Sequence, residues 1–246
     1  MKSCAVTDIG QIRKSNQDFV YASDFALGKL PNLYMVADGM GGHQGGGFAS
    51  RYAAERMVEL IGEDESGQEI PSLSRAIEEV NRELYQKACS FDDLRGMGTT
   101  LVTAVISDDI LYVANIGDSR LYLVGDEIRQ ITRDHSWVEE MVAQGELTRD
   151  SEQFIQNKNV ITRAVGVRDS VTADFFEVEL HPGDKILLCS DGLSNMLSAE
   201  EIRDIIHGKE TCQEAALSLL QAGNRRGGRD NISIVVVDPE VRAEAC

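Results

Sequence analysis

Short apolar runs separated by only two or three residues constrain the fold of this chain more than any other feature of its sequence. The breaks at 107–109 (Ser-Asp-Asp) and 125–126 (Gly-Asp) have the length of hairpin loops. Strands joined so tightly must run antiparallel, because a parallel crossover needs about a dozen residues or more. Apolar, β-branched and aromatic content predicts strands at 19–22, 33–37, 99–106, 110–115, 120–124, 128–132, 175–180, 185–189 and 232–237.

Four segments carry helical signals, and they come in two pairs. Apolar residues recur with a period of about 3.6 over 48–61 and again over 73–88. A capping box, Ser198 with Glu201, predicts the start of a third helix, and 212–222 is the fourth. Helix pairs that interrupt antiparallel strands, in place of strict β-α-β alternation, favour an α+β fold with sheets inside and helices outside.

Charge limits the partners of the chain. It has 41 acidic and 24 basic residues, for a formal net charge of -17. Such a surface repels phosphate backbones and anionic lipid headgroups, and no cluster of Lys and Arg offsets it. We therefore expect no nucleic-acid partner and no membrane partner. With no interface signal in the sequence, we expect a monomer.

The five cysteines are widely spaced and include no C-x-x-C pair, which argues against a disulfide framework or a zinc site and fits a reducing cytoplasm. We find no signal peptide, no apolar run of bilayer-spanning length, no linker and no internal repeat. The sequence predicts one cytoplasmic domain over residues 1–246.

Four aspartates stand beside glycine or a turn at the ends of apolar runs. Asp38, Asp118 and Asp191 each follow such a run, and Asp230 precedes the last one. Carboxylates that converge on one point repel each other unless a cation neutralises them, and hard oxygen donors favour Mg²⁺ or Mn²⁺ over zinc. A single aspartate of this kind is often only a turn residue, whereas four in the same setting favour a metal site.

Seven segments, in order, resemble the motif set of the metal-dependent serine/threonine protein phosphatases of type 2C (the PPM family), in their compact bacterial form. They are DIGQIRKSNQD (8–18), VADGMGGH (36–43), GTT (98–100), ANIGDSR (114–120), ITRAVG (161–166), LCSDGL (188–193) and GRDNIS (228–233). The resemblance covers about residues 5–237. It implies a four-layer sandwich of two central antiparallel sheets flanked by helix pairs, with a binuclear metal centre where the sheets meet.

The resemblance also implies ligands for two Mn²⁺ or Mg²⁺ ions. Asp38 would bridge both ions, the carbonyl of Gly39 would bind the second, and Asp191 and Asp230 would complete the first.

Further roles come from the same resemblance. Asp18 would hold a metal-bound water, and Asp118 together with Asp191 would form a third, weaker metal site. Arg13 would clamp the substrate phosphate, since a guanidinium grips two phosphate oxygens at once.

The implied reaction is hydrolysis of phosphoserine and phosphothreonine monoesters by in-line attack of a metal-bridging water or hydroxide, with no covalent enzyme intermediate. It would reverse a cognate serine/threonine protein kinase. The alternative is a catalytically silent phosphoprotein-binding or signalling module of the same fold. Such modules usually lose a metal-binding aspartate, and here every expected aspartate is present, as is Arg13.

Two features leave alternatives open. Met40 stands where many eukaryotic relatives carry a histidine proposed as general acid, so His43 is the candidate to protonate the leaving group. A metal-bound water is an equally good acid, and His43 is then a structural residue. The polar stretch 143–158 resembles a flap beside the cleft, with an ordinary surface loop as the alternative.

Overall fold

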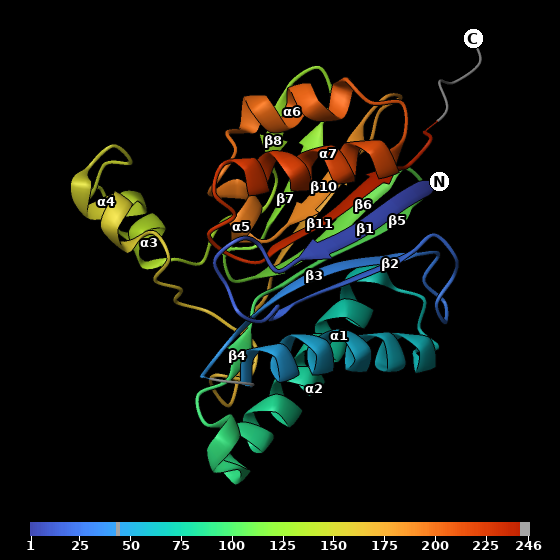
Figure 1. Ribbon diagram of the computed structural model, residues 1–246. Helices are drawn as coiled ribbons and strands as arrows, with labels where there is room; N and C mark the ends of the chain where they lie inside the picture. Colours follow the sequence, from blue (N-terminus) through green and yellow to red (C-terminus); the bar gives the residue numbers. More distant parts are fainter. Residues whose placement is uncertain (43–44, 242–246) are drawn as a thin grey trace.

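Two antiparallel β-sheets form the centre of the protein (Figure 1). The structure, a computed structural model, describes residues 1–42 and 45–241. The first sheet has the order β1 (Lys2–Asp8), β11 (Ile232–Asp238), β10 (Lys185–Cys189), β7 (Arg120–Val124) and β8 (Ile128–Gln130). The second has the order β2 (Asp18–Ser23), β3 (Leu33–Met40), β5 (Leu101–Ser107), β6 (Ile110–Ile116) and β9 (Asp174–Glu179), with β4 (Gly98–Thr99) paired to the end of β3.

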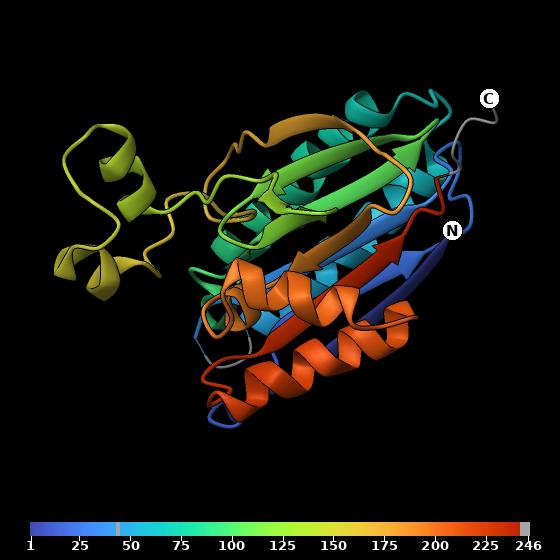
Figure 2. The same ribbon diagram turned by 90° about the horizontal axis from the view of Figure 1, so that it is seen from above.

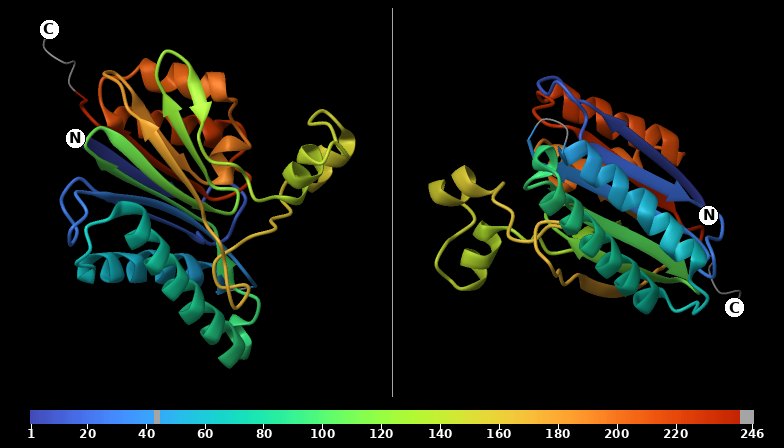
Figure 3. Two further views of the ribbon diagram at one scale, coloured as in Figure 1. Left: turned by 180° about the vertical axis from the view of Figure 1, so that it is seen from behind. Right: turned by 90° about the horizontal axis from the view of Figure 1, so that it is seen from below.

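A pair of helices covers the outer face of each sheet. The pair α1 (Gly45–Glu63) and α2 (Glu69–Ser90) packs on the second sheet, where the two helices lie side by side (Figures 1 and 3). The pair α6 (Ala199–His207) and α7 (Cys212–Arg225) packs on the first sheet. The predicted α+β sandwich of four layers is therefore confirmed.

Apolar side chains fill all three spaces between these layers. Met35 points into the core beneath α1 and α2, whereas its neighbour Val36 lies between the sheets. Leu187 and Leu188 divide in the same way between the core beneath α6 and α7 and the central core. Because successive side chains of a strand face opposite sides, strands buried on both faces must be apolar throughout, and the sequence shows such runs.

Local signals place several elements correctly. Asp108 and Asp109 have φ angles of 48° and 59° in the turn between β5 and β6, the left-handed region that two-residue hairpin turns require. The capping box at the start of α6 is present, since the Ser198 side chain accepts from the backbone of Glu201 and the Glu201 side chain accepts from the backbone of Ser198. Strand β1 was not predicted. It lies at the edge of the first sheet, partly exposed, and it is stabilised by pairing with β11.

Two short helices project from the sandwich on the side where the strands end (Figure 2). They are α3 (Trp137–Ala143) and α4 (Glu152–Asn157). The predicted flap 143–158 thus contains a helix that its polar pattern did not reveal. The helix begins where Ser151 Oγ accepts a hydrogen bond from the backbone N–H of Phe154 at 3.2 Å.

Along residues 1–42 and 45–241, no helix combines the length and the apolar character that crossing a membrane requires.

Candidate active site

A cavity of about 280 Å³ opens where strands of both sheets end. Asp38 lies near the end of β3, Asp118 in the turn between β6 and β7, Asp191 at the start of α5 (Asp191–Ser194) after β10, and Asp230 two residues before β11. All four aspartates line this cavity. Two further predicted site residues, Arg13 and Gly39, line it as well. The fold therefore brings all four strand-end aspartates to one place.

The backbone around Asp38 is held by the Gly-Thr-Thr segment. The N–H of Asp38 donates to Thr100 Oγ1 at 2.9 Å, and its carbonyl accepts from the Thr100 N–H at 2.8 Å and from Thr99 Oγ1 at 2.9 Å. Next along the chain, a Cβ at Gly39 would lie 2.0 Å from the carbonyl oxygen of Gly46. No larger residue fits there, so Asp38 lies on a backbone with little freedom to move.

Burial and mutual repulsion disfavour the charged forms of these carboxyls. Burial, followed by the charge of Asp191, raises the pKa of Asp118 to about 7. Burial, followed by Asp230, raises the pKa of Asp191 to about 6. Burial, followed by the charge of Asp18, raises the pKa of Asp38 well above its ordinary value. A cluster of this kind favours a bound cation, because a cation would remove the repulsion.

Asp18 lies behind the cavity and does not line it. It pairs with Asp38 across β2 and β3, and only 8% of its surface is exposed. Ser190 Oγ donates to Asp18 Oδ2 at 2.8 Å, whereas Oδ1 is buried without a hydrogen-bond partner. Burial raises the pKa of Asp18 to about 6, and the hydroxyls of Ser233 and Ser190 oppose the rise. This position suits the predicted contact through water better than a direct contact with a metal ion.

The donor set fits a hard divalent cation in its chemistry. Its side-chain donors are carboxylates, and Oδ1 of both Asp18 and Asp191 is buried without a partner. Even so, among the described residues no three His, Cys, Asp or Glu side chains are grouped closely enough to hold one ion. Asp230 instead accepts a hydrogen bond from Arg13 Nη2 at 2.6 Å.

Asn231 joins the two loops that carry Arg13 and Asp230, and sequence reasoning missed it. Its Oδ1 accepts from the N–H of Gln17 at 2.9 Å. Its Nδ2 donates to the carbonyls of Ile9 and Ser15 at 3.0 and 3.1 Å. The only signal in the sequence is its position beside Asp230 in the last motif.

Replacing Asn231 by alanine is expected to lower the free energy of unfolding by about 2–4 kcal/mol, because three hydrogen bonds of about 1 kcal/mol each are lost and buried backbone groups are left unpaired. Urea unfolding measures the change. The control is Asn157→Ala, which removes a side chain that donates to the carbonyl of Gln153 within α4. Equal stability of the two variants would show that Asn231 does not clamp the loops.

A chain of hydrogen bonds connects the projecting segment to the cavity. Lys158 Nζ donates to Asn195 Oδ1 at 2.7 Å, and Asn195 Nδ2 donates to Asp191 Oδ2 at 3.0 Å. The end of the predicted flap is therefore in indirect contact with a predicted metal ligand. Met40 lines the cavity beside Gly39, and His43 lies outside the described residues.

Known proteins resemble this chain over nearly its whole length. Residues 12–219 match the family model described as Protein phosphatase 2C. A serine/threonine phosphatase, stp, of Listeria innocua is 39% identical over 237 residues, which are 94% of this chain and 93% of that protein. The crystal structure of the Mycobacterium tuberculosis serine/threonine phosphatase PstP/Ppp has a TM-score of 0.87 at 34% identity and covers 98% of this chain and 99% of that one.

The crystal structure of the catalytic domain of a serine/threonine protein phosphatase PstP, in complex with two manganese ions, has a TM-score of 0.83 at 33% identity and covers 96% of each chain. Both solved structures share the fold of this chain. The chain therefore belongs to the protein phosphatase 2C family and is a metal-dependent protein phosphatase of that type.

Proposed function

We propose that this protein removes phosphate from phosphoserine and phosphothreonine side chains of proteins and so reverses a cognate serine/threonine kinase. The observation that carries the proposal is the cavity in which four carboxylates and Arg13 lie together. The names of the related phosphatases from Listeria innocua and Mycobacterium tuberculosis support serine and threonine as the targets.

Two Mn²⁺ or Mg²⁺ ions are the proposed cofactors, supported by the two manganese ions of the PstP complex. Asp38, the Gly39 carbonyl, Asp191 and Asp230 would hold them, and Asp118 with Asp191 would hold a third. When bound, such ions neutralise the charge of the phosphate and lower the pKa of water so that hydroxide forms at neutral pH. Asp18 would orient a water molecule from behind, through its unpartnered Oδ1.

Arg13 is the proposed phosphate clamp. Half of its side chain is exposed, and within residues 1–42 and 45–241 its one ion-pair partner is Asp230, at 2.6 Å. The ion pair with Asp230 raises the pKa of Arg13 further, so the guanidinium is charged whenever substrate is present. If the Arg13 guanidinium separated from Asp230, its N–H groups could bind two phosphate oxygens and orient the phosphorus for in-line attack. Met40 offers no proton to the leaving alcohol, so either His43 or a metal-bound water would be the donor.

The proposed setting is a monomer in the cytoplasm, acting on phosphoproteins and not on nucleic acid or membranes. The acidic composition and the free state of Cys4, Cys89, Cys189 and Cys212 support this setting. Residues 1–246 would make up one catalytic domain, with 143–158 as its flap.

Hydrolysis assays with and without metal test the proposal. With Mn²⁺ we expect turnover of p-nitrophenyl phosphate and of a phosphothreonine peptide, loss of turnover in EDTA, and recovery when Mn²⁺ is added in excess. A folded, metal-loaded protein that binds the phosphopeptide without hydrolysing it would instead support the silent signalling module.

A further inference from the structure

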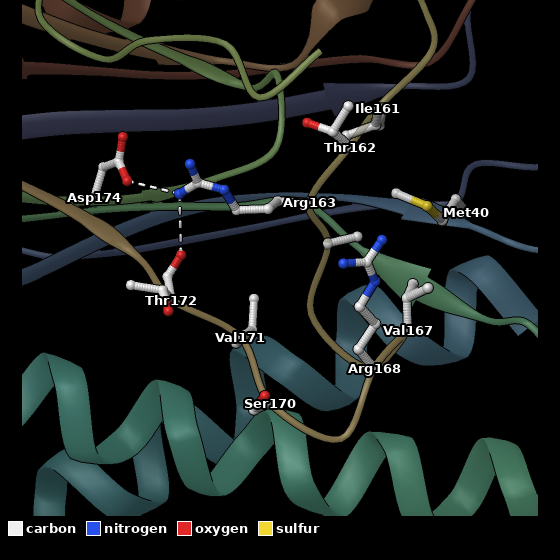
Figure 4. A pocket seen from close by; sticks show the side chains of 11 residues that line it. Met40, Ile161, Thr162, Arg163, Val167, Arg168, Ser170, Val171, Thr172 and Asp174 are labelled. Carbon is white, nitrogen blue, oxygen red and sulfur yellow. Dashed lines mark hydrogen bonds and ion pairs between the residues drawn. The ribbon is translucent and has the colours of Figure 1, made fainter. Parts of the chain in front are cut away.

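A second cavity, of about 570 Å³, lies directly beside the one that contains the aspartates. Met40 and Ile161 line both cavities, so the two are neighbours across a shared apolar edge. The segment 161–174 forms most of the other wall (Figure 4). A peptide whose phosphoresidue enters the first cavity can therefore extend across Met40 into the second.

The wall of this second cavity is fixed in place. Val165 and Thr99 exchange two backbone hydrogen bonds of 3.0 and 2.9 Å. Asn81, buried in α2, accepts from the N–H of Gly166 at 2.8 Å and donates to the carbonyl of Arg168 at 3.1 Å. The backbone that carries Arg168 is thus tied both to the second sheet and to α2, so the position of this residue is set by the fold.

Two arginines enter the cavity, and only one of them has an acidic partner. Arg163 Nη1 donates to Asp174 Oδ1 at 2.7 Å and to the carbonyl of Thr172 at 3.3 Å. Among the described residues, none forms an ion pair or a hydrogen bond with the exposed side chain of Arg168. Figure 4 shows Arg163 extending to Asp174, whereas the guanidinium of Arg168 lies on the side of Met40.

An uncompensated guanidinium is notable in a chain of net charge -17. Protein surfaces of this charge repel acidic peptides, and a cation beside the site would oppose that repulsion locally. Met40, Ile161 and Val167, which line this end of the cavity with the uncharged Thr162, are apolar and offer contacts to a peptide without selecting for charge.

We propose that Arg168 binds an anionic side chain of the phosphoprotein substrate, close in sequence to the residue that is dephosphorylated. The anion is a carboxylate of Asp or Glu or a second phosphate group, since both accept paired hydrogen bonds from a guanidinium. The inference rests on the proposed function and adds a preference for acidic sequence around the target residue. A charge-assisted contact at a partly exposed site corresponds to about a tenfold preference in kcat/KM.

Phosphothreonine peptides that differ in one residue test the proposal. One series has a glutamate placed successively farther from the phosphothreonine on either side, one has a second phosphothreonine, and the reference is neutral. For the manganese-loaded wild type we expect kcat/KM to rise about tenfold at one glutamate position, and to rise less as salt screens the contact. Whether glutamate or phosphate gives the larger gain identifies the natural anion.

Arg168→Gln is expected to remove this preference, so that acidic and neutral peptides have similar kcat/KM. The matched control is Arg129→Gln, because Arg129 is exposed on β8 of the other sheet and lines neither cavity. It should keep the preference. A wild type without preference, or an Arg168→Gln variant that keeps it, would overturn the inference while turnover of p-nitrophenyl phosphate still supported the phosphatase. Absence of turnover on every substrate would reject both.

Discussion

Replacing Asp38 by asparagine is expected to lower the turnover of a phosphothreonine peptide by about a thousandfold or more, which corresponds to about 4 kcal/mol of transition-state stabilisation. Asp38 is the proposed ligand shared by both metal ions, and an amide has nearly the same shape but no charge to hold them. The measurement is kcat in saturating Mn²⁺. Asp109→Asn is the control, because Asp109 lies in the exposed turn between β5 and β6, and it should retain wild-type turnover.

The same variant should fold. In EDTA, Asp38→Asn is expected to melt at or above the temperature of the wild type, because the substitution removes a buried carboxyl whose pKa is raised by burial and by neighbouring aspartates. Thermal unfolding followed by circular dichroism measures this. Normal turnover in Asp38→Asn would remove Asp38 from its bridging role, and a lower melting temperature in EDTA would show that its charge is not repelled.

Removing the metal is expected to make stability fall as the pH rises from about 4 to about 7. An aspartate in the unfolded chain titrates near pH 4. In the folded protein, the pKa is about 6 for Asp18 and Asp191 and about 7 for Asp118. Between these values the folded state binds more protons than the unfolded state, so stability is lost as the pH rises. Each pKa unit is worth about 1.4 kcal/mol, so the total reaches several kcal/mol.

Urea unfolding in EDTA at a series of pH values measures this loss, and saturating Mn²⁺ should abolish it, because a bound cation stabilises the deprotonated carboxylates. Asp118→Asn should reduce the slope, whereas Asp109→Asn should not. Carboxyls whose pKa is lowered, such as that of Asp174 beside Arg163, change the stability only at a pH below about 4. A flat profile in EDTA would contradict the repulsion among the site carboxyls.

The sequence predicted those parts of the fold whose signals are local. Tight turns and apolar runs indicated the hairpin of β5 and β6, and a capping box marked the start of α6. Strand β1 escaped prediction because its stability comes from β11, more than 220 residues away in the register that pairs Asp8 with Ile232. Helix α4 escaped because it is short and buries none of its residues, including its two apolar ones, Phe154 and Ile155.

In the candidate site, too, the features with local sequence signals were predictable and those that depend on distant contacts were not. The positions of Asp38, Asp118, Asp191 and Asp230 at strand ends were visible in the sequence, and the fold brings all four to one cavity. The contacts among side chains from distant segments were not visible. The hydrogen bonds from Asn231 to the loop that carries Arg13 form only when β1 and β11 pair in the first sheet. No local sequence pattern predicts them.

The place of β11 between β1 and β10 has a consequence for the chain during its synthesis. Of the strands described, β11 leaves the ribosome last, and until then β1 lacks the one described strand with which it pairs. Asp230 and Asn231 emerge just before it. A nascent chain therefore cannot complete the first sheet or the carboxylate cavity until β11 has been translated, and chains that stop before β11 carry no assembled site.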